Sequence, residues 1–229
     1  MIKVLYEDNH IIAVYKPAGV LTQGDRTGDR SLMDDVKEYL KEKYKKEGNV
    51  FLGLVHRLDK PVAGIVLFGK TSKGASRLSE QFRSHTIQKT YHAIVVGKPK
   101  QEKGSIKEKV NKISFFAEGF TNKTDEELLA EIKKATKTRT AELSYEVVRS
   151  NDKYSLLKVL PKTGRFHQIR IQMQQMGCPI LGDQKYGAKD SLPDWSIALA
   201  ATAISFKSAT DNKSINLEIP LPEEWNRYI

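Results

Sequence analysis

The order of apolar and polar positions predicts a chain built largely from short strands. Residues 2–15 are rich in β-branched side chains and are interrupted at Asp8 and Asn9, which predicts two strands joined by a turn. The continuous apolar run at 62–68 (VAGIVLF) is typical of a strand that is buried on both faces. Further strands are predicted at residues 90–96, 142–149, 154–160, 197–206 and 214–219.

Four other segments space their apolar side chains three or four residues apart, as amphipathic helices do. Residues 31–46 start at Ser31, whose hydroxyl can cap the first turn, and Gly48 follows their end. Residues 124–137 carry acids in the first turn and lysines in the last, which the helix dipole favours. The other two predicted helices span residues 72–84 and 166–176.

Together these elements predict a single α+β domain over residues 1–229. The strands at 142–149 and 154–160 flank a polar turn and should form a hairpin. The lysine-rich stretch 98–112 should be an exposed hairpin or loop. The sequence contains no linker, repeat or low-complexity block, so most strands should pair antiparallel with their neighbours in sequence.

Charge narrows the classes of partner. The chain has 38 Lys and Arg against 28 Asp and Glu, a formal charge of +10. A basic surface favours an anionic partner, but charge alone does not separate nucleic acid from an anionic membrane. The apolar runs are far shorter than the ~20 residues of a membrane-spanning helix. Residues 1–14 contain Glu7, Asp8 and Asn9 and do not resemble an export signal, so we expect a cytoplasmic protein.

Cysteine and histidine usage predicts neither a disulfide nor a metal site. Cys178 is the single cysteine, which excludes an intramolecular disulfide and fits a reducing cytosol. The histidines lack the spacing of metal ligands and have no companion cysteines. They are His10, His56, His85, His92 and His167.

Residues 64–71 (GIVLFGKT) match the sequence pattern of a phosphate-binding P-loop. A P-loop needs a tight turn whose backbone N–H groups face phosphate, whereas Ile65, Val66 and Leu67 are strand formers. We therefore interpret the match as accidental and do not expect an NTPase.

Two polar clusters carry candidate chemistry. Residues 55–60 (VHRLDK) place one acid among cations just before the apolar strand, and the alternative is a solvated turn in which Arg57 or Lys60 pairs with Asp59. Residues 162–170 (KTGRFHQIR) place cations at a predicted strand-to-helix junction, and the alternative is a helix start capped by Thr163. Because cations oppose the dipole at a helix start, an anion should lie nearby, either RNA phosphate or Asp59.

Further sequence blocks surround these two clusters and follow a fixed order. The chain thereby resembles the RluA-type family of RNA pseudouridine synthases along nearly its whole length. The combination of HRLD, KxYxAxVxG, GRxHQIR and GxPIxGDxxYG in this order is highly specific. The blocks are 8–19 (DNHIIAVYKPAG), 56–69 (HRLDKPVAGIVLFG), 81–97 (QFRSHTIQKTYHAIVVG), 163–170 (TGRFHQIR), 177–187 (GCPILGDQKYG) and 220–225 (PLPEEW).

The resemblance implies a fold and an activity. The fold is one catalytic domain on a long, mainly antiparallel mixed sheet flanked by helices, with RNA in a basic cleft. The activity is isomerisation of uridine to pseudouridine in ribosomal or transfer RNA, without cofactor. Because the first block starts at residue 8, we expect no accessory RNA-binding domain ahead of it. We also expect a monomer without a protein partner.

The resemblance also implies roles for individual residues. Asp59 matches the nucleophile, Tyr91 the tyrosine that lies against the target base, and Arg165 the arginine that pairs with the carboxylate and keeps it ionised. Arg57 matches the arginine that fills the gap left by an extruded base. The remaining residues expected to contact RNA are His56, Lys60, Lys89, His167, Gln168 and Arg170.

Three positions depart from the family pattern. These departures leave open only the shape of the pocket wall and the RNA sequence that is preferred. Phe166 stands where Thr is usual, Gln172 where His is frequent, and Ala200 in a place where a Leu-His-Ala triplet is common. In addition, the charge of residues 98–112 and 124–137 suggests that these segments help to select the RNA.

Two other functions remain alternatives. A non-catalytic RNA-binding protein could share the fold, although Asp59, Tyr91 and Arg165 keep chemically competent side chains. A hydrolase of glycosidic bonds usually needs two carboxylates, and the only second acid in the HRLD, KxYxAxVxG, GRxHQIR and GxPIxGDxxYG motifs is Asp183, in a setting typical of a tight loop.

Overall fold

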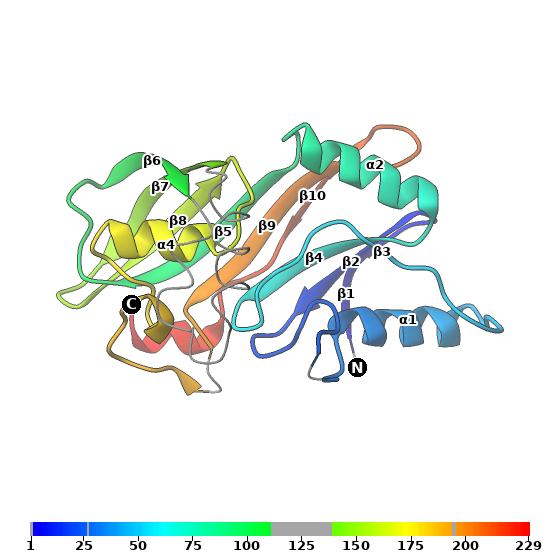
Figure 1. Cartoon of the computed structure of the whole chain (residues 1–229), viewed down its shortest axis with the longest axis horizontal. Coiled ribbons are helices and arrows are strands. Elements are labelled where there is room, and N and C mark those ends of the chain that lie inside the picture. Colours follow the sequence, from blue (N-terminus) through cyan, green and yellow to red (C-terminus); the bar gives the residue numbers. More distant parts are fainter. Residues whose placement is uncertain (1, 27, 111–138, 194–195) are drawn as a thin grey trace, which may run out of the picture.

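The computed structural model describes residues 2–26, 28–110, 139–193 and 196–229. Its strands form a sheet in the order β1-β2-β4-β9-β5-β8-β7-β6, with β3 paired to β4 and β10 to β9 (Figure 1). The strands are β1 (Lys3–Glu7), β2 (Ile11–Lys16), β3 (Gly53–Leu54), β4 (Ala63–Gly69), β5 (Gln88–Val96), β6 (Lys103–Val110), β7 (Arg139–Ser150), β8 (Tyr154–Pro161), β9 (Leu199–Lys207) and β10 (Ser214–Glu218). The helices are α1 (Leu32–Lys43), α2 (Ser72–Arg83) and α4 (Gln168–Gln175), with short 3-10 turns at Gln184–Tyr186 (η2) and Glu223–Arg227 (η4).

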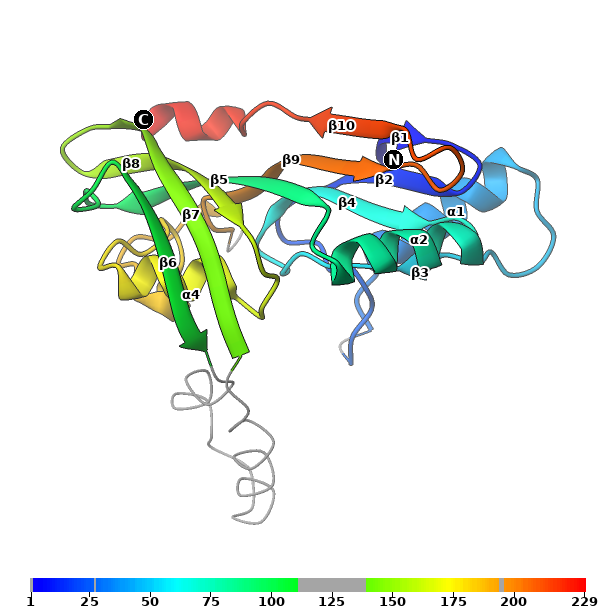
Figure 2. The same cartoon turned by 90° about the horizontal axis from the view of Figure 1, so that it is seen from above.

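The described sheet is mixed but mainly antiparallel, which confirms the predicted fold class. Its one parallel pairing joins β4 to β9 over two residue pairs, Ala63 with Ala200 and Gly64 with Ala201. All other strand pairs are antiparallel. Figure 2 shows α2 and α4 on the same side of the sheet, with the red 3-10 turn η4 near the C-terminus on the opposite side.

Both faces of β2 and β4 are covered by a hydrophobic core, which explains why these strands are continuous apolar runs. Ile12 and Val66 face a core that includes α1, whereas Ile11 and Ile65 face a second core that includes Leu78 of α2. Successive side chains of a strand point to opposite faces, so both faces must be apolar when both are covered.

The structure confirms most of the predicted elements and shifts some of their ends. Ser31 accepts a hydrogen bond from the backbone N–H of Asp34 and begins α1, as expected. The stretch 98–112 was expected to be a hairpin or loop by itself, whereas residues 103–110 form the single strand β6, which pairs antiparallel with β7. Residues 64–71 run through β4 and not through a phosphate-binding turn. The helix predicted at 124–137 lies outside the described residues.

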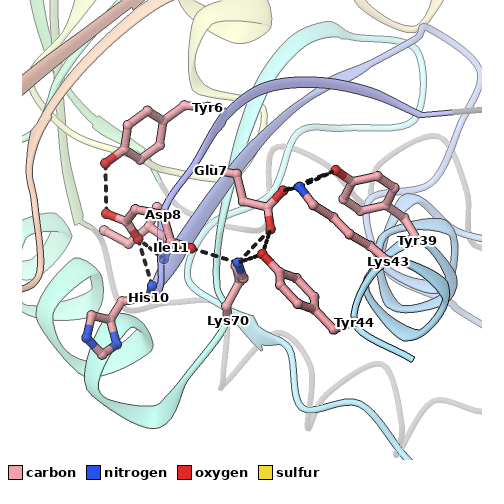
Figure 3. Close-up of polar contacts among 9 residues, drawn as sticks. All are labelled: Tyr6, Glu7, Asp8, His10, Ile11, Tyr39, Lys43, Tyr44 and Lys70. Atoms are coloured by element: carbon pink, nitrogen blue, oxygen red, sulfur yellow. Dashed lines mark hydrogen bonds and ion pairs between the residues drawn. The ribbon is translucent and has the colours of Figure 1, made fainter. Parts of the chain in front are cut away.

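The carboxylate of Glu7 ties α1 to the sheet (Figure 3). Its Oε2 accepts hydrogen bonds from Lys43 Nζ at 2.7 Å and from the Tyr39 hydroxyl at 3.1 Å. Its Oε1 accepts from Lys70 Nζ and from the Tyr44 hydroxyl, both at 2.6 Å. The Glu7 side chain is only 9% exposed. Burial alone would raise the pKa of Glu7, but these donors outweigh it and lower the pKa to about 2.

We expect Glu7→Gln to lower the free energy of unfolding by about 2–3 kcal/mol at pH 7. Because the folded pKa lies below the unfolded value, the contribution is full above about pH 5 and disappears as the pH falls toward 2. Urea unfolding at several pH values measures both effects. Glu42→Gln, at an exposed position of α1, is the matched control. An equal loss in both variants would contradict the prediction.

Candidate active site

The loop that carries Asp59 is fixed by contacts from residues 16–22, at the end of β2 and in the loop that follows it. The buried Thr22 hydroxyl donates to the Leu58 carbonyl at 2.8 Å and accepts from the Leu58 N–H at 3.1 Å. The Lys60 carbonyl accepts from the Gly19 N–H at 2.8 Å and from Lys16 Nζ at 3.1 Å. Asp59 therefore stands between two clamped residues.

Strand β4 brings this loop against β9, which requires a glycine at residue 64. Gly64 has a φ of 131°, and a Cβ there would lie 2.4 Å from the Ala201 carbonyl oxygen. Only glycine allows such an approach of two backbones. The approach places the start of β4, and the loop before it, beside the centre of the sheet.

Tyr91 reaches the same place from β5. The pairing of β5 with β9 shifts register between Thr90 and Tyr91, and such a bulge re-aims the side chains that follow it. Tyr91 lines the same pocket as Asp59. Burial, and secondarily the charge of Asp59, raises the pKa of Tyr91, so its hydroxyl keeps its proton at neutral pH.

The segment before α4 forms the third wall. His167 occupies the N-cap with a φ of 49°, in the left-handed region, and its side chain does not cap the helix. Buried Gln168 holds the segment instead: its Oε1 accepts from the Thr163 hydroxyl and the Arg165 N–H, and its Nε2 donates to the Glu142 carbonyl. The predicted helix start at residue 166 is therefore two residues too early.

Arg170 is the guanidinium that approaches Asp59. Its Nε and Nη2 donate to the two carboxylate oxygens of Asp183, both at 2.7 Å, while Nη1 lies 3.6 Å from Asp59 Oδ2. Asp183 is 1% exposed. The Tyr186 ring lies against the same guanidinium, with its centroid 4.8 Å from Cζ. A bidentate pair of this kind fixes the plane of the arginine and so the direction in which Nη1 points.

His167 is the second group on the Asp59 carboxylate. Its Nε2 lies 3.5 Å from Asp59 Oδ2, and its Nδ1 is 2.8 Å from the Tyr186 hydroxyl. Burial and the neighbouring Arg170 lower the pKa of His167 to about 3, so the imidazole is neutral at physiological pH. His167 therefore contacts Asp59 without adding a positive charge.

Burial dominates the electrostatics of Asp59, whose side chain is 25% exposed. Burial raises the pKa of Asp59, and the opposing charges of Arg170, Arg57 and Lys16 do not fully cancel the rise. Lys16 is itself buried, which lowers its pKa to about 7 although Asp59 opposes the shift. The nearby cations favour the ionised form of Asp59, and a carboxylate that is poorly solvated is more reactive than one in water.

These walls enclose a pocket of about 700 Å³. Asp59 is the only carboxylate among its lining residues in the described part of the chain, and Asp183 is not among them. That arrangement argues against hydrolysis by two carboxylates. Cations line the pocket as well: Arg57, Arg83, Lys89, Arg165 and Arg170. The described residues contain no group of three or more His, Cys, Asp or Glu arranged to hold a metal ion.

Several expected roles need correction. Arg165 lines the pocket, but its Nε donates to the Thr140 carbonyl at 3.1 Å, and the ion pair with Asp59 belongs to Arg170. Arg170 and Gln168 are buried and bonded internally, and their expected contact with RNA stays a prediction. The solvated-turn alternative for Asp59 differs from the structure, in which Lys60 pairs with Asp29 and Asp59 lies 3.6 Å from Arg170 Nη1.

His56 is another internal residue that was expected to contact RNA. Its Nε2 accepts a hydrogen bond from the Leu67 N–H at 2.9 Å, and its ring lies 4.7 Å from that of Phe82. Arg57 and Lys89, in contrast, line the pocket and form no hydrogen bond or ion pair with other described residues. Burial lowers the pKa of Lys89.

The three departures from the family pattern have different surroundings. Gln172 is fully buried on α4, where its Nε2 donates to the Ile106 carbonyl, and Ala200 is buried in β9. Neither residue lines the pocket. Phe166 does line the pocket and is 45% exposed.

Sequence reasoning also missed residues that lie outside the pocket lining but influence the side chains in it. Asp183 was interpreted as part of a structural loop, and Lys16 and Tyr186 were given no role. Asp183 is an acid within a block of mixed polarity, and a search for an internal partner for the second arginine of the 162–170 cluster could have found it. No comparable signal identifies Lys16.

Comparison with known proteins identifies the family of this chain. The profile of the RNA pseudouridylate synthase family matches residues 10–175. The chain is 34% identical to the ribosomal large subunit pseudouridine synthase C of Rickettsia bellii, over 98% of this chain and 70% of that protein. It is 31% identical to the dual-specificity RNA pseudouridine synthase RluA of Vibrio parahaemolyticus, over 82% of this chain and 70% of that protein.

A solved structure has the same fold. It is that of human RNA pseudouridylate synthase domain containing 4, with a TM-score of 0.77 at 23% identity, covering 98% of this chain and 90% of that one. The pocket and the matched profile define an enzyme that modifies RNA. The chain belongs to the RNA pseudouridylate synthase family, and within it to the RluA type. In the described part of the chain, no helix is long and apolar enough to cross a membrane.

Proposed function

We propose that this enzyme converts a uridine of large-subunit ribosomal RNA to pseudouridine, with Asp59 as nucleophile and without a cofactor. The observation that carries the proposal is the position of Asp59, the single described carboxylate in a pocket that also holds Tyr91 and cations. The choice of ribosomal RNA follows the Rickettsia relative, whose name gives that substrate.

The reaction balances without any added group. The bond from N1 of uracil to C1′ of ribose breaks, and a bond from C5 to C1′ forms. The C5 proton leaves and a proton is gained at N1, so neither an oxidant nor a co-reactant is consumed. A carboxylate can hold one half of the substrate covalently while the uracil turns, either at the base or at C1′.

The neighbouring side chains suit this role. Arg170 directs one N–H toward Asp59 and favours its ionised form, and Tyr91 offers a flat ring to the uracil and a protonated hydroxyl for proton transfer. Arg57 is exposed at the pocket and can fill the space that an extruded base leaves. Lys89, a cation without an acid partner among the described residues, suits a phosphate of the target strand.

Charge elsewhere on the enzyme also bears on RNA selection. On the paired strands β6 and β7, Lys103 pairs with Glu146 at 2.7 Å and Lys107 with Glu142 at 3.7 Å. These acids offset part of the positive charge on which the expected RNA contact of 98–112 rested. Because residues of one chain line the pocket, we propose that the enzyme acts as a monomer. The single cysteine supports a reducing compartment, and we propose the cytoplasm.

The test is to incubate purified enzyme with unmodified total RNA in the presence of EDTA and to map pseudouridine by carbodiimide-dependent stops of reverse transcription. We expect one or a few new stops in large-subunit ribosomal RNA, absent without enzyme. Stops confined to transfer RNA would contradict the substrate, and stops only without EDTA would contradict the cofactor-free reaction. Absence of stops in naked RNA and in ribosomal subunits would contradict the function.

A further inference from the structure

Phe166 is an aromatic side chain exposed beside the catalytic carboxylate. Five large apolar side chains are exposed in the described part of the chain, and Phe166 is the one among them that lines the pocket. A single exposed apolar residue is ordinary on a protein surface. Its position at the pocket, however, separates Phe166 from the other four and places part of an aromatic surface where a ligand would bind.

The orientation of the Phe166 ring is fixed by the site itself. The ring stacks on His167, with centroids 3.8 Å apart and an interplanar angle of 15°. His167 is held in turn by the Tyr186 hydroxyl at 2.8 Å and lies 3.5 Å from Asp59. Phe166 is therefore one ring layer away from the group that contacts Asp59, and it is oriented before any substrate arrives.

The surroundings of Phe166 favour a nucleotide. Arg165 precedes it, and a Cβ on Gly164 would meet nothing closer than Lys89 Nζ at 3.7 Å. The strand of RNA that enters here thus meets an aromatic face between cations, next to backbone without side-chain bulk. Alternation of aromatic rings with cations is the arrangement by which proteins hold unpaired nucleotides, since every base has a face to stack.

We propose that Phe166 stacks on the base of a nucleotide adjacent to the target uridine, once that uridine has turned into the pocket. The inference rests on the proposed function and deepens it. Extrusion of the uridine removes a stacking partner from its neighbours, and Phe166 replaces it. Phe166 is thus a binding residue that makes the neighbouring base part of the recognised sequence, with purines preferred because their larger faces stack better.

The test compares Phe166→Leu, Phe166→Trp and wild type on a stem-loop RNA that contains the mapped uridine. Loss of one stacked base weakens binding about tenfold or more, so Phe166→Leu should raise KM by that factor with a much smaller change in kcat. Phe166→Trp should keep the KM of wild type. Phe51→Leu is the matched control, because Phe51 is 50% exposed and does not line the pocket.

A second readout locates the stacked base. With 2-aminopurine placed 5′ or 3′ of the target, wild type and Phe166→Trp should quench its fluorescence at one of the two positions, and Phe166→Leu should not. Unchanged KM and quenching in Phe166→Leu overturn the proposal. So does a fall in kcat at unchanged KM, which would mean that Phe166 only supports His167. If wild type forms no pseudouridine in naked RNA or in ribosomal subunits, the proposed function is overturned instead, and the stacking role with it.

Discussion

Asp59→Asn should reduce pseudouridine formation at least ~1000-fold while leaving RNA affinity within a few-fold of wild type. The amide keeps the shape of the carboxylate and its place between Leu58 and Lys60, but it is not a nucleophile. Single-turnover assays on a stem-loop that contains the mapped uridine measure the rate, and filter binding measures the affinity. The control is Asp29→Asn, an exposed acid that pairs with Lys60 outside the pocket. Equal loss of rate in both variants, or a loss in Asp59→Asn much smaller than ~1000-fold, would contradict the role of Asp59.

The same substitution should raise the melting temperature at neutral pH. Burial raises the pKa of Asp59, so the folded protein binds this proton more tightly than the unfolded chain does. The ionised carboxylate therefore costs stability above its unfolded pKa, and the cost vanishes as the pH falls below it. Asparagine removes that cost, and the gain in melting temperature should shrink toward pH 3. Enzymes often have active-site groups that lower the stability of the fold but are needed for activity.

The strands and helices were largely predictable because their patterns are local. The apolar run at 62–68 identified β4, since burial of both faces leaves no other composition. Ser31 identified the start of α1 because a cap depends only on the residues beside it. The start of α4 was misplaced because a left-handed residue, His167, precedes it and a tertiary contact of Gln168 replaces the cap. The parallel pairing of β4 with β9 joins residues more than 130 apart and has no local signal.

The candidate site was predictable in composition but not in its internal contacts. Motif order pointed to Asp59 and Tyr91, and both line the pocket. Arg165 and Arg170 are five residues apart in the sequence. The conformation of the turn between them decides which one approaches Asp59. Side chains in a helix lean toward its N-terminus, so Arg170, inside α4, leans back to Asp59. Arg165, before the helix, instead meets the Thr140 carbonyl.

Arg170→Lys should lower kcat/KM at least ~100-fold, whereas Arg165→Lys should change it less than about fivefold. Arg170 serves two acids at once, with Nε and Nη2 on Asp183 and Nη1 toward Asp59. An ammonium is a point charge on a flexible stem and cannot keep both contacts in one plane. Because Asp183 is 1% exposed, lysine should stay with it and leave Asp59 without its cation. Steady-state kinetics on the stem-loop RNA compare the two variants.

The pH dependence separates this role from simple loss of folding. Arg170 lowers the pKa of Asp59 against the effect of burial, so its loss should move the acid limb of the kcat profile to higher pH. A misfolded variant would lose activity at every pH without such a shift. Arg165→Lys should keep the wild-type profile, because Arg165 does not pair with Asp59 in this structure. If instead Arg165→Lys shifts the acid limb and Arg170→Lys does not, the arginine before α4 must move onto Asp59 when RNA binds, and Arg170 serves only to hold Asp183.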